Sequence, residues 1–317
     1  MASEFEIIAR YFSKLGKTSP HTRLGVGDDA AVVEVPDGKQ LVVCLDNLVG
    51  GIHFPLDTDP ADIAYKALAV NASDLAAMAA RPEWFQMSLT LPQVDEPWLD
   101  GFAAGLREAA EYFAVELVGG DTCRGPLAVA IQIAGLVPAD GYVTRAGARA
   151  GDIVAVSGQL GNAALGLAFL RGEIELPETT AEKCLLALNR PRPRLELAPF
   201  LRQFAASAID LSDGLLGDLR HILEASGCGA EIDRATIPVD AWIERQGEYG
   251  YALSAGDDYE ICFTVAAADR GEIETWNRAN PGCPLTVIGA ITESGYRLRV
   301  GKESINLEQR QGYRHFG

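Results

Sequence analysis

A carboxylate in the middle of an apolar helix face is the feature that most constrains how this chain can fold. Residues 60–79 have the spacing of a helix: with Ile63 set to zero at about 100° per residue, Ala67 falls near 40°, Val70 near 340° and Asp74 near 20°. A buried carboxylate is costly unless it is capped, paired with a base or bound to a metal. We therefore expect the fold to place a partner beside Asp74, and the helix pattern leaves all three kinds of partner open.

The chain is strongly acidic. Its 317 residues include 27 Lys and Arg against 44 Asp and Glu, which gives a formal net charge of −17. A surface of this charge repels nucleic acids and anionic membranes, so we expect neither as a partner. An anionic substrate would need a cation between itself and the protein, and bound metal ions are one way to supply it.

The positions of the cysteines and histidines argue against several classes of metal and redox protein. The six cysteines lack the spacing of zinc or redox motifs, so we predict that they are reduced and act as small hydrophobic residues in a cytoplasmic protein. The four histidines do not form a His-Glu-x-x-His pattern, and any metal is expected to be a hard cation on oxygen ligands. No run of about 18 apolar residues suggests a membrane helix, and the acidic N-terminal sequence does not resemble an export signal.

The order of the predicted elements in the first half is typical of an α+β domain with mainly antiparallel strands. A turn signal at 36–38 suggests that strands 30–35 and 41–45 form a hairpin. The stretch 138–151 is rich in Gly, Ala, Arg and Pro, and we expect it to join two domains, at residues 1–140 and 150–317. The other expected elements are helices at 5–15, 60–79 and 96–113 and strands at 85–91, 127–137 and 152–157.

Acidic residues recur beside glycine at the ends of predicted elements, in both halves of the chain. Each place alone is explained by a solvated turn or a helix cap, and Ser212 has the position of an N-cap. Together they predict that several carboxylates converge on one cleft and bind two or more Mg²⁺ ions, which would hold phosphate groups. The places are Gly25 to Asp29, Asp46, Gly119 to Thr122, Ile209 to Gly214 and Gly256 to Glu260.

The common phosphate-binding motifs are missing from the sequence. There is no Gly-x-x-x-x-Gly-Lys-Ser/Thr loop and no His-Arg-Asp loop of the protein-kinase type. The segment Gly158 to Asn162 follows a strand and opens a helix, yet it is not Gly-x-Gly-x-x-Gly, and we interpret it as a tight turn.

The sequence resembles the thiamine-monophosphate kinase family from about residue 4 to the C-terminus, and seven segments, in the same order, carry the resemblance. They are Gly25 to Ala31, His53-Phe54, Ala67 to Met78, Gly119 to Thr122, Asp210 to Leu215, Gly256 to Glu260 and Gly312 to Phe316. The resemblance implies a two-domain α+β architecture like that of aminoimidazole ribonucleotide synthetase. It also implies a homodimer in which the N-terminal sheets of two subunits join as a barrel, so that residues 1–140 would serve both metal and ATP binding and dimerisation.

The implied reaction is ATP-dependent, Mg²⁺-assisted phosphorylation of thiamine monophosphate to thiamine diphosphate, the last step in making that cofactor, with K⁺ as a further candidate ion. By motif, the metal ligands would be Asp29, Asp46, Asp74, Asp121, Asp210 and Asp213. Contacts with ATP would come from Gly120, Asp121, Arg145 and Ser212, and contacts with thiamine monophosphate from His53, Asp257 and Tyr313. Two positions depart from the family: Cys44-Leu45 stand where hydroxyl residues are usual, and Asp257 stands where Glu is frequent.

The chemistry of such a reaction suits these residue types. The acceptor is a phosphate monoester with a second pKa of about 6, so at neutral pH it is a dianion that needs no general base. Mg²⁺ and Arg145 would reduce the repulsion between two anions, while Tyr313 could stack on the cationic thiazolium part and Asp257 could offset its charge. Two alternatives stay open: another ATP-dependent enzyme of the same superfamily, or a non-catalytic Mg-nucleotide-binding protein.

Overall fold

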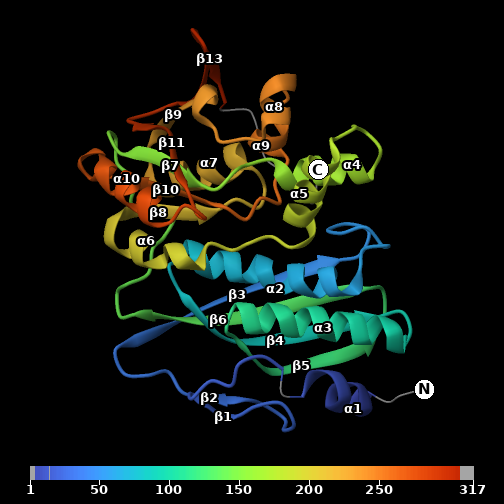
Figure 1. Ribbon diagram of the computed structural model, residues 1–317. Coiled ribbons are helices and arrows are strands. Elements are labelled where there is room, and N and C mark those ends of the chain that lie inside the picture. The colour runs from blue at the N-terminus through green and yellow to red at the C-terminus, as the bar shows by residue number, and fades with distance from the viewer. Residues whose placement is uncertain (1–3, 14, 308–317) are drawn as a thin grey trace. The chain divides into compact units, whose positions relative to one another are not determined.

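The computed structural model describes residues 4–13 and 15–307 and divides into two compact units (Figure 1). The N-terminal unit comprises the chain up to residue 75 together with 80–142, and the C-terminal unit comprises 76–79 and the chain from 143 onward. Among the described residues, no helix is both long and apolar enough to cross a membrane.

The N-terminal unit is built on a four-stranded sheet whose strands lie in the order β3 (Lys39–Val49), β6 (Ala128–Pro138), β4 (Arg81–Leu91) and β5 (Glu116–Arg124). Strand β6 pairs antiparallel with both neighbours, whereas β4 and β5 are parallel. The parallel pair is connected through α3 (Glu96–Tyr112), as a parallel connection requires. Figure 1 shows α3 and α2 (Pro60–Ala77) on the same face of this sheet.

The two faces of β3 differ sharply in their side chains. Alternate residues of a strand point to opposite faces, and here Val42, Cys44 and Asp46 are half-buried while Leu41, Val43 and Leu45 are 41%, 48% and 62% exposed. Cys44 and Asp46 contact Asn71 of α2, so the half-buried set is the one that faces the helices. The opposite face of β3 therefore presents an apolar ladder to solvent at the edge of the sheet.

The predicted hairpin between residues 30–35 and 41–45 is wrong. Strand β2 (Val32–Val33) is very short and pairs instead with β1 (Thr22–Leu24), while β3 pairs along its whole length with β6. The physical reason is the length of the ladder: β6 offers eleven residues in continuous register, many more than a two-residue strand can. The N-terminal segment begins with α1 (Glu4–Ile7) and a π-helix, η1 (Ile8–Phe12), where a single helix over 5–15 was expected.

The C-terminal unit is built on a seven-stranded sheet with helices on both faces. Its strands lie in the order β13 (Glu303–Asn306), β12 (Tyr296–Val300), β9 (Gly229–Asp233), β11 (Leu285–Thr292), β7 (Ile153–Ser157), β10 (Ile261–Val265) and β8 (Ala205–Asp210). Among the described strands of this sheet, only β9 and β12 pair in parallel. The α+β class predicted from the sequence is thus confirmed in both units.

Two apolar cores cover the two faces of this sheet. Val154 and Val156 of β7 pack in one core with α7 (Leu215–Ser226). Ile153 and Ala155 pack in the other core with α6 (Ala198–Phe204) and α10 (Arg270–Ala279). The remaining helical segments are α4 (Asn162–Leu170), α5 (Glu178–Asn189), η2 (Leu195–Leu197), η3 (Arg234–Thr236), α8 (Ala241–Gln246), α9 (Gly250–Ser254) and η4 (Ala267–Asp269).

A buried ion pair joins strands β7 and β10 to the segment before α6. The Glu260 carboxylate accepts hydrogen bonds from Arg194 Nε at 2.7 Å, from Arg194 Nη2 at 2.5 Å and from Ser157 Oγ at 2.5 Å. Ser157 Oγ in turn accepts the Ile261 N–H at 2.9 Å. Because every oxygen of this buried carboxylate is engaged, removing the base would leave an uncompensated charge in the core.

We predict that Arg194→Met lowers the free energy of unfolding by about 3–5 kcal/mol, measured by urea denaturation, because Glu260 loses its counter-ion. The matched control is Arg171→Met, since Arg171 is 61% exposed and lies 4.0 Å from Glu173. This control should change stability by less than about 1 kcal/mol. Equal effects of the two substitutions would contradict the prediction.

Candidate active site

Asp46 and Asp74 are the candidate metal ligands that the N-terminal unit brings together. The backbone N–H of Asp46 donates to Asn71 Oδ1 at 3.0 Å, and Asn71 lies one helical turn before Asp74 on α2. Burial, and then the nearby charge of Asp74, raise the pKa of Asp46 to about 6. Asp74 itself is half-buried within a helix whose residues 63–73 are all buried, so the single apolar stripe expected from the sequence is really a helix buried on almost every side.

His53 is held by the turn that follows β3. Its Nδ1 accepts the backbone N–H of Val49 at 2.9 Å, which places the proton of the neutral ring on Nε2. Asp29 lies in an exposed segment before β2, and its backbone N–H donates to Asp28 Oδ1 at 2.9 Å. The structure does not place Asp29 with the Asp46–Asp74 pair.

Gly120 and Asp121 lie on β5, at the far edge of the sheet from Asp46. Asp46 is opposite Ile131 on β6, Ile131 is opposite Met87 on β4, and Met87 is opposite Gly120 on β5. Three interstrand spacings of about 4.8 Å, roughly 14 Å in all, therefore separate β3 from β5. Gly120 has φ +156°, and a Cβ there would meet Met87 O at 2.0 Å, so only glycine allows this close pairing.

The expected convergence of all the carboxylates is therefore not seen within one N-terminal unit. In residues 4–13 and 15–307, no group of three or more His, Cys, Asp or Glu side chains is arranged to hold a metal ion. Two carboxylates on β3 and α2 form the pair described above, and Asp121 belongs to the opposite edge.

In the C-terminal unit, two candidate loops are joined by backbone hydrogen bonds. Asp210 ends β8 and is buried, and the chain then turns through Ser212 and Asp213 into α7. Leu211 N donates to Glu260 O, Tyr259 N to Leu211 O and Asp257 N to Ser212 O, each at 2.8 Å. Asp257 and Tyr259 have φ values of 67° and 50°, a strained conformation that these three bonds maintain.

The N-cap interpretation of Ser212 is wrong. The N-cap position of α7 is Gly214, which has φ 99° and makes no side-chain cap. The chain has not yet reached helical geometry at Ser212, because Gly214 bends it first. Arg145 lies in an exposed segment that runs beside β8, where Ala208 N donates to Thr144 O at 3.0 Å.

The sequence pattern missed one aspartate of this loop cluster. Asp218, in the first turn of α7, is 3% exposed, and its Oδ2 accepts the Asp213 N–H at 3.0 Å. Burial raises the pKa of Asp218 to about 7, and the charge of Arg145 acts in the opposite direction. The helical spacing of Leu215, Leu219 and Ile222 places position 218 beside their apolar face, so the signal used for Asp74 could have found it.

Asp258 belongs to the acidic segment Gly256 to Glu260 that the sequence pattern singled out. Its Oδ1 accepts the Gly161 N–H at 2.7 Å, while its Oδ2 is buried with no hydrogen-bond partner in the described part of the chain. Burial raises the pKa of Asp258 well above its ordinary value. Asp258 thus connects the loop at 256–260 to the glycine turn at 158–161, where Gly158 and Gly161 have positive φ, as a tight turn requires.

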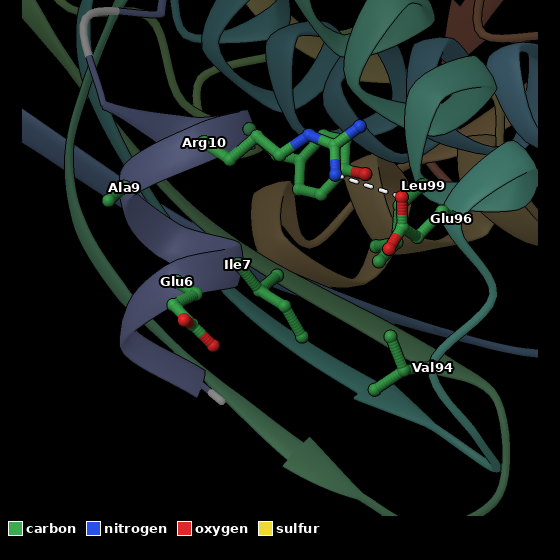
Figure 2. Close-up of a pocket in the computed structure, with 8 residues that line it drawn as sticks. Glu6, Ile7, Ala9, Arg10, Val94, Glu96 and Leu99 are labelled. Carbon is green, nitrogen blue, oxygen red and sulfur yellow. Dashed lines mark hydrogen bonds and ion pairs between the residues drawn. The ribbon is translucent and has the colours of Figure 1, made fainter. Parts of the chain in front are cut away.

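The remaining candidate, Tyr313, lies outside the described residues. A separate pocket of about 660 Å³ lies in the N-terminal unit between η1 and the start of α3 (Figure 2). Arg10 on its wall is bound to Glu96 at 2.9 Å, and Ile7, Val94 and Leu99 supply apolar surface. None of the candidate site residues within the described part of the chain lines this pocket.

Comparison with known proteins identifies the family on both halves of the chain. Residues 27–137 match the model of the AIR synthase related protein, N-terminal domain, and residues 149–301 match that of the C-terminal domain. Thiamine-monophosphate kinase of Escherichia coli (strain K12) is 44% identical over 321 residues, which cover 99% of this chain and 98% of the relative.

Solved structures agree with the sequence comparison. The crystal structure of thiamine-monophosphate kinase from Stenotrophomonas maltophilia K279a has a TM-score of 0.83 and 39% identity, over 92% of this chain and 94% of that one. The structure of AaThiL complexed with AMPPCP and TMP has a TM-score of 0.76 and 31% identity, over 92% of each chain. With its two domain matches and its full-length similarity, this chain belongs to the thiamine-monophosphate kinase family of AIR synthase related proteins.

Proposed function

We propose that this chain transfers the terminal phosphoryl group of ATP to thiamine monophosphate, giving thiamine diphosphate and ADP. The observation that carries the proposal is full-length similarity to thiamine-monophosphate kinases, among them a protein complexed with AMPPCP, an ATP analogue, and TMP. This places the chain at the last step in making thiamine diphosphate. The cytoplasmic location and any need for K⁺ stay predictions from the sequence.

The chemistry of the candidate residues supports phosphoryl transfer without a general base. The acceptor phosphate is already largely a dianion at neutral pH, so the protein has to orient it and reduce the repulsion between anions. His53 Nδ1 is engaged by a backbone N–H, and the neutral ring then presents an Nε2–H donor, which suits binding a phosphate rather than accepting a proton.

We assign the contacts with the two substrates as the family resemblance implies. Gly120, Asp121, Arg145 and Ser212 would contact ATP, and His53, Asp257 and Tyr313 would contact thiamine monophosphate. The strained backbone at Asp257 supports its part of the assignment, since strain of this kind is retained where surrounding bonds enforce it and where position matters for function.

Mg²⁺ fits the acidic residues of the N-terminal unit. Asp46 and Asp74 are two partly desolvated carboxylates whose charges repel, and a hard divalent cation with oxygen ligands would relieve that repulsion. Asp29, Asp121, Asp210 and Asp213 are the further ligands we propose. When bound, the metal would neutralise phosphate charge. Cys44 has its Sγ on Asn71 O at 3.5 Å, so the side-chain oxygens for the metal at this strand come from Asp46.

We also propose that the chain forms a homodimer through its N-terminal sheets. The solvent-facing ladder of Leu41, Val43 and Leu45 is unusual for the edge of a sheet exposed to water. Asp46 and Asp121 lie on opposite edge strands of one sheet. In a barrel of two copies, each edge lies beside an edge of the other sheet, so carboxylates that are separated within one chain can meet those of the second copy.

The reaction is tested with purified protein, ATP, Mg²⁺ and thiamine monophosphate. Asp74→Asn and Asp213→Asn are each expected to lower kcat by roughly a hundredfold or more, because each removes a charge that holds metal and phosphate. Circular dichroism should show an intact fold. Asp37→Asn, in an exposed turn, is the control and should retain wild-type rates.

Formation of no thiamine diphosphate by the wild type, with nucleotide still bound, would favour the non-catalytic alternative. ATP turnover only with a different acceptor would favour another enzyme of the superfamily. Near-normal rates in both variants would contradict the metal-ligand assignment.

A pH-dependent test addresses the Asp46–Asp74 pair in metal-free protein. The folded pKa of Asp46, about 6, is above its ordinary value of 3.8, so the folded state binds the proton more tightly and loses stability as pH rises through this range. Asp46→Asn should therefore raise stability in EDTA at about pH 8 by roughly 1–3 kcal/mol and have little effect below about pH 4.

Added Mg²⁺ should raise the unfolding temperature of the wild type at the same pH and raise that of Asp46→Asn much less. Scanning calorimetry measures both effects. An Asp46→Asn protein with no gain in EDTA and an unchanged response to Mg²⁺ would contradict the assignment.

The dimer is tested by Leu45→Lys, which places a charge in the middle of the exposed β3 ladder. We expect this variant to be monomeric by light scattering coupled to gel filtration, whereas the wild type is dimeric. Leu186→Lys is the matched control, because Leu186 is 59% exposed in the C-terminal unit against 62% for Leu45. A dimer that survives Leu45→Lys, or a monomeric wild type, would exclude this interface.

A further inference from the structure

Asp218 is a buried carboxylate whose contacts are made with the backbone of the site rather than with a base. Its neighbours on α7 include Leu215, Leu216 and Leu219, all of them buried. Its Oδ2 accepts the N–H of Asp213 at 3.0 Å, and the nearby backbone of Ser212 lowers the pKa of this carboxyl. No ion pair within 4.0 Å is recorded for it among the described residues.

The turn at 212–214 needs an acceptor of this kind. Residues before the N-cap Gly214 make no helical hydrogen bonds, so the N–H groups of Ser212 and Asp213 must find other partners. On the opposite side, Ser212 O is already engaged by Asp257 N at 2.8 Å. The turn is thus held from two directions, by the loop at 256–260 and by Asp218.

Other charged and titratable groups lie near enough to interact electrostatically with Asp218. They are Asp213, Arg145, Asp258 and Cys262, together with Tyr296 of β12, whose hydroxyl donates to Leu216 O at 3.1 Å. A carboxylate buried near other acids is costly, and packing alone does not require one here.

We propose that Asp218 is a positioning residue: its carboxylate binds the backbone N–H of Asp213 and so orients the Ser212–Asp213 turn toward nucleotide and metal. The proposal rests on the proposed function of the turn in ATP binding. It assigns to Asp218 an acceptor role, with no direct contact with substrate.

The acceptor role and a packing role predict opposite results for two substitutions. Asp218→Asn keeps an amide oxygen at the same position and can still accept the Asp213 N–H. Asp218→Leu keeps a side chain branched at Cγ, suits the surrounding leucines and removes the acceptor. Replacing a buried charge by an apolar side chain is often neutral or stabilising, so the leucine variant is expected to fold.

The experiment measures unfolding temperature, kcat and KM for both substrates, and the affinity for AMPPCP with Mg²⁺ by calorimetry. Asp218→Leu should unfold near the wild-type temperature, yet its kcat should fall roughly tenfold to a hundredfold and its AMPPCP affinity should weaken, because the turn is misplaced. Asp218→Asn should restore both to within about threefold of wild type, since the acceptor is retained.

Asp152 supplies the matched control. It is 9% exposed and its Oδ2 accepts a backbone N–H, that of Arg149 at 2.8 Å, just before β7. Asp152→Leu and Asp152→Asn should change stability only, with kcat and AMPPCP affinity unaffected.

Two results would overturn the proposal. Wild-type kcat and AMPPCP affinity in Asp218→Leu would show that the turn does not need the acceptor. An Asp218→Asn variant as impaired as Asp218→Leu would show that the charge, not the acceptor, matters. A wild type that binds AMPPCP but makes no thiamine diphosphate would defeat the proposed function alone, because the affinity measurements would still test Asp218.

Discussion

The backbone bonds between residues 211–212 and the loop at 257–260 are the constraint on which the C-terminal site depends. Three hydrogen bonds of 2.8 Å hold Asp257 and Tyr259 in a left-handed conformation that neither residue would adopt alone. Glu260, at the end of the same loop, is fixed by Arg194 and Ser157. The buried ion pair therefore anchors one end of the strained loop. Electrostatic catalysis requires polar groups that are held in place in advance in this way.

Much of the fold follows from local patterns, but strand partners do not. The helices at 60–79 and 96–113 were predictable because apolar spacing over many residues is a strong signal. The hairpin between 30–35 and 41–45 was wrong because pairing is decided by the long register of β3 with β6, which the local sequence does not contain. Parallel pairing of β4 with β5 likewise depends on the crossover through α3.

In the candidate site, too, some features follow from local patterns in the sequence and others depend on how the strands pair. Proximity of Asp46 and Asp74 could be anticipated from an acid on a buried helix, since a desolvated carboxylate needs a partner. The separation of Asp46 from Asp121 could not, because it is set by strand order. The helical spacing of α7 could have revealed Asp218 as a buried acid, but its partner, the backbone N–H of Asp213, leaves no trace in residue types. The residue roles themselves are a proposal from the family resemblance, because patterns alone leave them open.

The apolar ladder on β3 has a consequence for how the chain matures. An eleven-residue edge strand with Leu41, Val43 and Leu45 turned outward is a template on which foreign strands can add. In the proposed homodimer, a newly synthesised subunit would carry that hazard until the second subunit covers the strand. Assembly would then compete with aggregation, and the protein concentration in the cell would determine what fraction of the newly made chains assembles.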